Sequence, residues 1–315
     1  MLPVLENGEE TTLVGGQAVM EGVMMRSPHS YCVAVRKADG EIVTQESPLA
    51  RVSDRYPIFK LPVFRGLGTL GSAMWLGMRA LKFSAECAIE GVTGTAREST
   101  GREMGTGVMA FQIVFSLAFM IALYKFVPLY LATLIGKHVE AMSGRFAINM
   151  VDGGLRIAIF LGFMLLLSRM KEMRRVFEYH GAEHKVVFNF ESGQPVTVEN
   201  AQRFVTWHPR CGTSFLVVVL IIAMICYAFL PFDNFWMKFA ARIALLPLIV
   251  GLSYEVIRFA ARRRGGLMAV MTTPGLWLQR VTTQPPSNAQ TEVAICALSR
   301  AMELERVQGG VPVIA

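Results

Sequence analysis

The chain has 315 residues, of which 53% are hydrophobic and only 17% are charged, and its mean hydropathy is +0.42. This composition excludes a disordered or collagen-like chain and is unusual for a soluble domain. The apolar residues are gathered in long runs, so we expect a membrane protein. The five cysteines have no paired spacing, which argues against a secreted disulfide framework.

The region up to residue 60 carries the only β-like patterns. Its first residues, MLPVLENGEETTLVGG, are acidic and lack the basic and apolar parts of a signal peptide, so we expect the chain to begin in the cytosol. Segments 31–37 and 41–47 partly alternate between apolar and polar residues and flank the turn-forming Ala38-Asp39-Gly40. We therefore predict a small cytosolic β-hairpin unit over residues 1–60.

A glycine-rich motif, GGQAVMEGVMMRSP, occupies residues 15–28 of this unit. Its glycines allow tight turns whose amides could hold an anion, but the Lys-Ser/Thr pair of a phosphate-binding loop is missing. Glu21 lies among apolar residues and therefore needs a partner. The candidates are Arg26, an ion, or a basic group of segment 169–212, and a salt-bridged turn is the favoured interpretation.

Residues 61–106 are apolar but are interrupted by Arg65, Arg79 and Lys82. Each such charge would cost roughly 2.5–3.5 kcal/mol near the centre of a bilayer. We therefore expect interfacial amphipathic helices here rather than a membrane crossing. The run 265–279 is too short and too interrupted to cross, and we assign it to the interface as well.

Region 107–261 contains four apolar stretches that approach the roughly 20 residues needed to cross the hydrocarbon of a bilayer. The second holds Asp152 and Arg156, which leave it a short uncharged core, and Pro247 should kink the fourth. The predicted fold class is therefore mainly α, a polytopic helical membrane protein with about four transmembrane helices. The four stretches are 107–130, 150–168, 213–232 and 239–261.

Lysines and arginines are concentrated in loop 169–212 and just after the fourth stretch, whereas the opposite loops have few. This bias places both termini, loop 169–212 and a C-terminal helical tail, 262–315, in the cytosol. The same charges would attract anionic membrane lipids. They have no interleaved aromatic residues or RNA-binding motif and so predict no specific nucleic-acid site.

Loop 169–212 gathers three of the five histidines, within EYHGAEHK and WHPRCGTS. His180 and His184 are four residues apart, so on a helix both imidazoles could reach one divalent ion, for which zinc is the first candidate. With Glu183 they form HxxEH, the pattern with which inverzincins bind zinc. Glu183 would then be the catalytic general base that takes a proton from metal-activated water.

Further metal ligands must come from outside this pattern. Cys211 and His208 directly precede the third apolar stretch and should lie near the same membrane face. Glu199, on a short helix that Thr197 should cap, is an alternative. An interpretation without metal is also open, because short motifs arise by chance and Gly181 would weaken the helix by about 1 kcal/mol relative to alanine.

Four motifs, GGQAVMEGVMMRSP, EYHGAEHK, HPRCGTSF and GGLMAVMTTPGLWLQRVTT, occur in this order. Together they resemble the bacterial YqhQ family, and the resemblance covers about residues 11–300. That family is of unknown function and is described as predicted metal-dependent enzymes. The resemblance implies a multi-pass protein of the inner membrane and suggests a metal, but it names no substrate.

Two functions of different classes fit these observations. The first is a metal-dependent, hydrolase-like membrane enzyme whose site lies at the cytosolic face. The second is a non-catalytic factor for membrane-protein insertion or assembly, which docks a ribosome or translocon and uses the metal only as a structural site. A transporter is disfavoured, because Asp152, Arg156 and Glu255 fall toward the ends of the predicted crossings.

Overall fold

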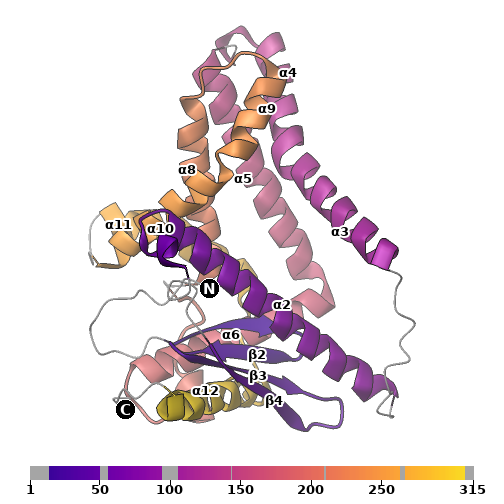
Figure 1. Cartoon of the computed structure of the whole chain (residues 1–315), viewed down its shortest axis with the longest axis vertical. Helices are drawn as coiled ribbons and strands as arrows, with labels where there is room; N and C mark the ends of the chain where they lie inside the picture. Colours follow the sequence, from indigo (N-terminus) through magenta and orange to yellow (C-terminus); the bar gives the residue numbers. More distant parts are fainter. Residues whose placement is uncertain are drawn as a thin grey trace.

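The computed structural model describes residues 14–49, 56–93, 106–142, 144–208, 211–262 and 267–308. These residues are mainly helical, with one four-stranded sheet near the start of the chain. In Figure 1 the sheet and the helices around it form one end of an elongated molecule, and long helices extend from there to the other end. The predicted fold class, a helical membrane protein with a small N-terminal β-unit, is confirmed.

The sheet is an antiparallel meander in the order β1-β2-β3-β4. Its second half is the predicted hairpin, whose turn uses the positive φ of Gly40, 91°. The glycine-rich motif, which we expected to form tight turns, instead forms the first hairpin. The strands are β1 (Gly15–Val19), β2 (Gly22–Arg26), β3 (Ser30–Arg36) and β4 (Ile42–Pro48).

Helices cover both faces of the sheet. On one face, Val19, Met24 and Val33 contact Leu76 and Ala80 of α2 (Phe64–Thr93). The opposite face packs against α6 (Lys171–Glu191) and α12 (Asn288–Gln308), two helices that are far apart in sequence. The N-terminal sheet therefore shares its hydrophobic core with segment 169–212 and with the C-terminal helix.

Glu21 lies at the tip of the first hairpin, with a φ of 53°. Its carboxylate accepts hydrogen bonds from the guanidinium of Arg175 on α6, through Nε and, at 2.6 Å, through Nη2. Of the candidate partners for Glu21 that the sequence left open, the structure shows a basic group of segment 169–212. This ion pair links the hairpin to α6.

Helix α2 is continuous over 30 residues, where we predicted interfacial helices, and η1 (Pro57–Lys60) precedes it. Met74, Trp75 and Met78 of this helix are exposed. The guanidinium of Arg79 lies 5.0 Å from the centroid of the Trp75 ring. An apolar face bordered by a cation suits a membrane interface, and that location stays a prediction.

Two helices are long and apolar enough to cross a membrane within the described ranges, Val114–His138 and Arg145–Arg169. The first joins α3 (Thr106–Ile121), the π-helix η2 (Ala122–Phe126) and α4 (Val127–His138). The second is α5, and η3 (Glu140–Met142) lies between the two.

A third crossing exists if α9 (Phe235–Ala244) and α10 (Leu246–Arg262) count as one bent span, since they meet at 49° beside Pro247. The remaining apolar helix, α8 (Gly212–Ala228), has 17 residues and falls short of the length needed. By length and composition, the described residues therefore contain two candidate crossings, or three with the bent pair, where about four were predicted. Helix α11 (Leu267–Thr282) packs against α8.

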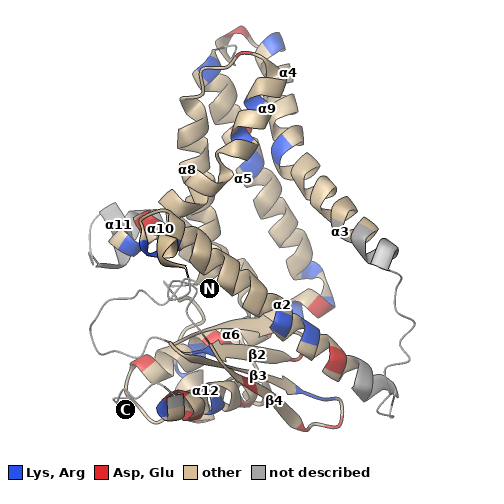
Figure 2. Ribbon diagram, viewed as in Figure 1, with Lys and Arg blue, Asp and Glu red and all other residues tan. Residues whose placement is uncertain are grey.

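Charged side chains are sparse along α3 and α8, as Figure 2 shows. Helix α5, in contrast, carries the buried Asp152, whose carboxylate lies 2.8 Å from Arg156 Nη2 and 2.8 Å from Arg242 Nη1 of α9. Arg156 is the twelfth of the 25 residues of α5, so the expectation that these charges fall at helix ends is wrong for Arg156. Glu255 of α10 accepts a hydrogen bond from Arg65 Nε of α2 at 2.6 Å.

Candidate metal centre

Helix α6 runs through the HxxEH motif without a break, so His180, Glu183 and His184 share one helical segment as predicted. Gly181, which we expected to weaken the helix, is required by packing. A Cβ atom at this position would collide with the backbone oxygen of Gln284. The glycine therefore lets the segment after α11 cross directly over α6.

Both histidines are oriented by backbone carbonyls. His180 Nδ1 lies 2.8 Å from the oxygen of Thr282, and His184 Nδ1 is hydrogen-bonded to the oxygen of Thr206. A carbonyl oxygen can only accept, so Nδ1 donates in each ring, and Nε2 is the nitrogen that a metal would use. Histidines that bind metals are usually fixed in this way.

Cys211 provides the third group of the cluster. It occupies the N-cap position of α8, is buried, and its Sγ lies 3.3 Å from His180 Nε2. Two ligands on a tetrahedral zinc, with a Zn–N bond of 2.0–2.1 Å and a Zn–S bond of 2.3 Å, would be about 3.5 Å apart. The distance therefore fits a shared ion.

The electrostatics favour a thiolate at Cys211. Burial alone would raise the pKa of this thiol, but the neighbouring His180 and His184 hold it well below its usual value. The thiolate is the form of cysteine that binds metals. The ligand atoms of His180, His184 and Cys211 all lie within 4.8 Å of one another, so this group could hold a metal ion.

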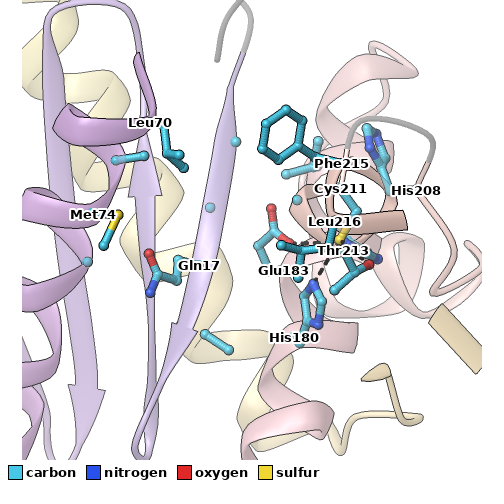
Figure 3. A pocket seen from close by; sticks show the side chains of 18 of the residues that line it. Gln17, Leu70, Met74, His180, Glu183, His208, Cys211, Thr213, Phe215 and Leu216 are labelled. Atoms are coloured by element: carbon cyan, nitrogen blue, oxygen red, sulfur yellow. Dashed lines mark hydrogen bonds and ion pairs between the residues drawn. The ribbon is translucent and has the colours of Figure 1, made fainter. Parts of the chain in front are cut away.

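Glu183 lies beside this group. Its side chain is almost fully buried, and its Oε2 is 3.4 Å from His184 Nε2. Its other neighbour is β1, because a Cβ atom on Gly16 would be only 2.5 Å from Glu183 Cγ. Figure 3 shows the carboxylate between the strand and the Cys211–His180 pair. Glu183 is therefore close to the ligands without belonging to the group of three.

His208 and Glu199, the other predicted candidates, lie outside the group of three. The main chain of His208 is held by Gln279, which accepts from the amide at 2.7 Å and donates to the carbonyl at 2.8 Å. Burial, and then the charge of His184, lower the pKa of the His208 ring to about 4. Glu199 is exposed on α7 (Val198–Gln202), which Thr197 caps as predicted.

A cavity of about 620 Å³ opens next to the cluster. Its walls come from β1, from one side of α2, from α6 and from the first turns of α8, and most of the side chains are apolar. Its polar lining residues are Gln17, His180, Glu183, His184, His208, Cys211 and Thr213. The three potential ligands therefore lie in the wall of a cavity.

The sequence interpretation missed the contributions of β1 and α2 to this cavity. Gly16 and Gln17 belong to the glycine-rich motif, which was noticed but interpreted as turns. Leu70 and Met74 of α2 carry no sequence signal that distinguishes them from other apolar residues of the interfacial region.

Comparison with known proteins agrees with the resemblance. A family profile described as "Protein of unknown function (DUF1385)" matches residues 61–304. The chain belongs to this family. The protein described as "Uncharacterized protein YqhQ" from Bacillus subtilis (strain 168) is 34% identical over 301 residues, which cover 92% of each chain. No solved structure matches the chain. The matched residues include His180, His184 and Cys211, and the family's description assigns no function.

Proposed function

We propose that the protein is a metal-dependent hydrolase associated with a membrane. In this proposal His180, His184 and Cys211 hold a divalent ion, and Glu183 is the general base. The observation that carries the proposal is the position of the three ligand atoms, within 4.8 Å of one another, in the wall of a cavity of about 620 Å³. A nitrogen and sulfur ligand set is typical of zinc.

A divalent ion would supply Lewis acidity at this place, polarising a carbonyl oxygen and making water a better nucleophile. The protein's own contribution is proton transfer by Glu183, which is buried beside the ligand nitrogen of His184. The carboxylate would accept the proton from water and deliver it to the leaving group. The carbonyls of Thr206 and Thr282 keep both histidines in the tautomer that leaves Nε2 free.

We also propose that the chain lies in the plasma membrane with both termini and segment 169–212 in the cytosol. The excess of lysine and arginine in segment 169–212 supports this orientation. The packing of the N-terminal sheet, α6 and α12 around one core also supports it, because these elements must then be on the same side of the membrane.

The proposal can be tested on the purified full-length chain loaded with Co²⁺, whose absorption spectrum reports its ligands. We expect one ion per chain, a thiolate-to-cobalt band that Cys211→Ser removes, and a spectral change on adding acetohydroxamate, a small chelating anion that needs an open coordination position. Zinc-loaded protein should hydrolyse 4-nitrophenyl acetate. Glu183→Gln should keep the ion but lose at least about 100-fold in rate, the lower range of general base catalysis.

Two results would overturn the proposal. One is a cobalt spectrum that acetohydroxamate leaves unchanged, since a closed site with four protein ligands is structural. The other is a Glu183→Gln variant as active as the wild type. Either result would favour the non-catalytic insertion or assembly factor, in which the metal only fastens α6 to α8.

A further inference from the structure

Strand β1 is an edge strand that runs along the cavity. Within the described residues it pairs with β2 alone, because the sheet order is β1-β2-β3-β4. Its successive residues face different helices: Gly16 contacts Glu183 of α6, and Gln17 contacts α2 at Gly77. The edge of β1 that is not paired with β2 thus lies between α2 and α6, the two helices that form the cavity walls.

The cavity runs beside β1. It follows β1 from Val14 to Ala18 and α6 from Val176 to Val187. At 3.4 Å per step along a strand and 1.5 Å per step along a helix, these two spans are about 14 Å and about 16–17 Å long. An extended chain of about four or five residues therefore matches the length of the cavity.

Two kinds of extended chain can lie along β1, a polypeptide strand and an acyl chain. An edge strand presents backbone N–H and C=O groups that need partners. An acyl chain in this mostly apolar cavity would leave these groups without hydrogen-bond partners, which is unfavourable. A polypeptide strand would pair with them and place alternate side chains against α2 and α6. The edge strand therefore favours a peptide.

We propose that the substrate is an extended polypeptide segment with apolar side chains, which adds to the sheet along β1. This inference rests on the proposed hydrolase function and specifies its substrate class. Leu70, Met74 and Met78 of α2 line the cavity on successive helical turns. Methionine side chains adapt to different partners, so the backbone rather than a particular side chain provides most of the recognition.

The position of Glu183 matches this mode of binding. Its side chain lies over Gly16, so a strand paired with this part of β1 passes beside the carboxylate. In the hydrolysis step, the oxygen of water forms a bond to the peptide carbonyl carbon, and the carbon–nitrogen bond breaks. Glu183 takes the proton from the water and transfers it to the leaving amine, so that it is regenerated.

The test compares three hydroxamates that share one chelating group. They are acetyl-Val-Leu-Phe hydroxamate, the same compound with N-methylated Leu and Phe amides, and decanoyl hydroxamate. Their dissociation constants from the full-length, cobalt-loaded chain in detergent follow from the change in the cobalt spectrum. We expect the unmethylated peptide to bind at least about tenfold more tightly than either competitor, because it alone can pair with β1.

Ala73→Trp should fill the cavity from α2 and weaken the peptide hydroxamate at least about tenfold, while acetohydroxamate still binds. Lys82→Trp is the matched control on the exposed side of α2 and should change neither.

Equal binding of the methylated and unmethylated peptides, or tighter binding of decanoyl hydroxamate, would overturn the peptide proposal, and the latter would indicate a lipid substrate. The hydrolase function would survive either result as long as acetohydroxamate binds and 4-nitrophenyl acetate is cleaved. Loss of both of those activities would instead refute the proposed function itself.

Discussion

The thiol of Cys211 lies 3.3 Å from Nε2 of His180, although the two residues are 31 positions apart in the sequence. One belongs to α6, in the body that contains the sheet, and the other caps α8, in the group of apolar helices. The contact therefore connects the sheet-containing part of the molecule to the group of apolar helices. An ion held there would fix the position of α6, and with it β1, relative to the apolar helices.

The close approach of β1 to α6 gives a matched pair of glycine substitutions. Gly16→Ala would place a Cβ atom 2.5 Å from Glu183 Cγ and should lower the free energy of unfolding by about 1–3 kcal/mol through overpacking. Gly15→Ala, next to it, meets no atom within 4 Å and should have little effect. Chemical denaturation in micelles measures both. Equal stabilities of the two variants would show that β1 does not press on Glu183.

The buried charges of the apolar helices can be compared with an exposed pair. Asp152→Asn removes the carboxylate that Arg156 and Arg242 share, and should destabilise the protein by about 3–5 kcal/mol. Asp233→Asn removes the partner of Arg145 at the surface and should cost less than about 1 kcal/mol. The same denaturation measurement applies to both. If Asp152→Asn were as stable as Asp233→Asn, the buried network would not hold the helices together.

The attachment of α12 to the sheet should depend on pH. Glu305 accepts hydrogen bonds from Ser27 Oγ at 2.7 Å and from the amide of His29 at 2.8 Å. Burial alone would raise the pKa of this carboxyl group, but these hydrogen bonds and the His29 ring, whose Nδ1 lies 2.7 Å from Glu305 Oε1, lower it below its ordinary 4.5. A depressed pKa contributes stability that is complete above the unfolded value and is lost as the pH falls through the folded value.

Wild-type protein should therefore be more stable than Glu305→Gln at neutral pH, and the difference should shrink as the pH falls below about 4.5. Glu303→Gln, on the exposed side of the same helix, is the control and should differ little from wild type at any pH. Urea unfolding at a series of pH values measures this. A difference that stays constant down to pH 3 would mean that the Glu305 carboxylate is not the stabilising form.

The orientation in the membrane predicts which cysteines an impermeant reagent can reach. Gln194 is exposed, at the end of α6 away from the apolar helices. A cysteine introduced there, in a chain whose own cysteines are replaced, should react in inverted vesicles and not in intact cells. Labelling in intact cells would place segment 169–212 outside the cytosol and reverse the proposed topology.

Local patterns were sufficient for several parts of this structure. Alternation together with Ala38-Asp39-Gly40 located the second hairpin, and the spacing of His180 and His184 predicted one helical face. The isolated charge of Glu21 indicated that it needs a partner, and one of the three candidates, a basic group of segment 169–212, is the partner found. The first two inferences depended on residues close in sequence. The inference on Glu21 depended on the free-energy cost of leaving a carboxylate unpaired among apolar residues.

Other parts depend on contacts between distant segments. The first hairpin was missed because Gly15 and Gly16 give β1 no alternating pattern, and only the tertiary contact with Glu183 explains Gly16. Arg242 lies 90 positions from Asp152, so no window of sequence could show the pair. His208, also a predicted ligand, lies outside the group of three, although its ring centroid is 5.7 Å from that of His184 and its main chain is bonded to Gln279 of α11.

The central claim is that His180, His184 and Cys211 hold one divalent ion with an open position. Zinc X-ray absorption spectroscopy of the full-length protein, purified without chelators, tests it most directly. The account predicts one zinc per chain, with one sulfur ligand at about 2.3 Å and the remaining nitrogen or oxygen ligands at about 2.0–2.1 Å, one of them replaced when acetohydroxamate is added. Protein without stoichiometric metal, or zinc with no sulfur ligand, would contradict the account.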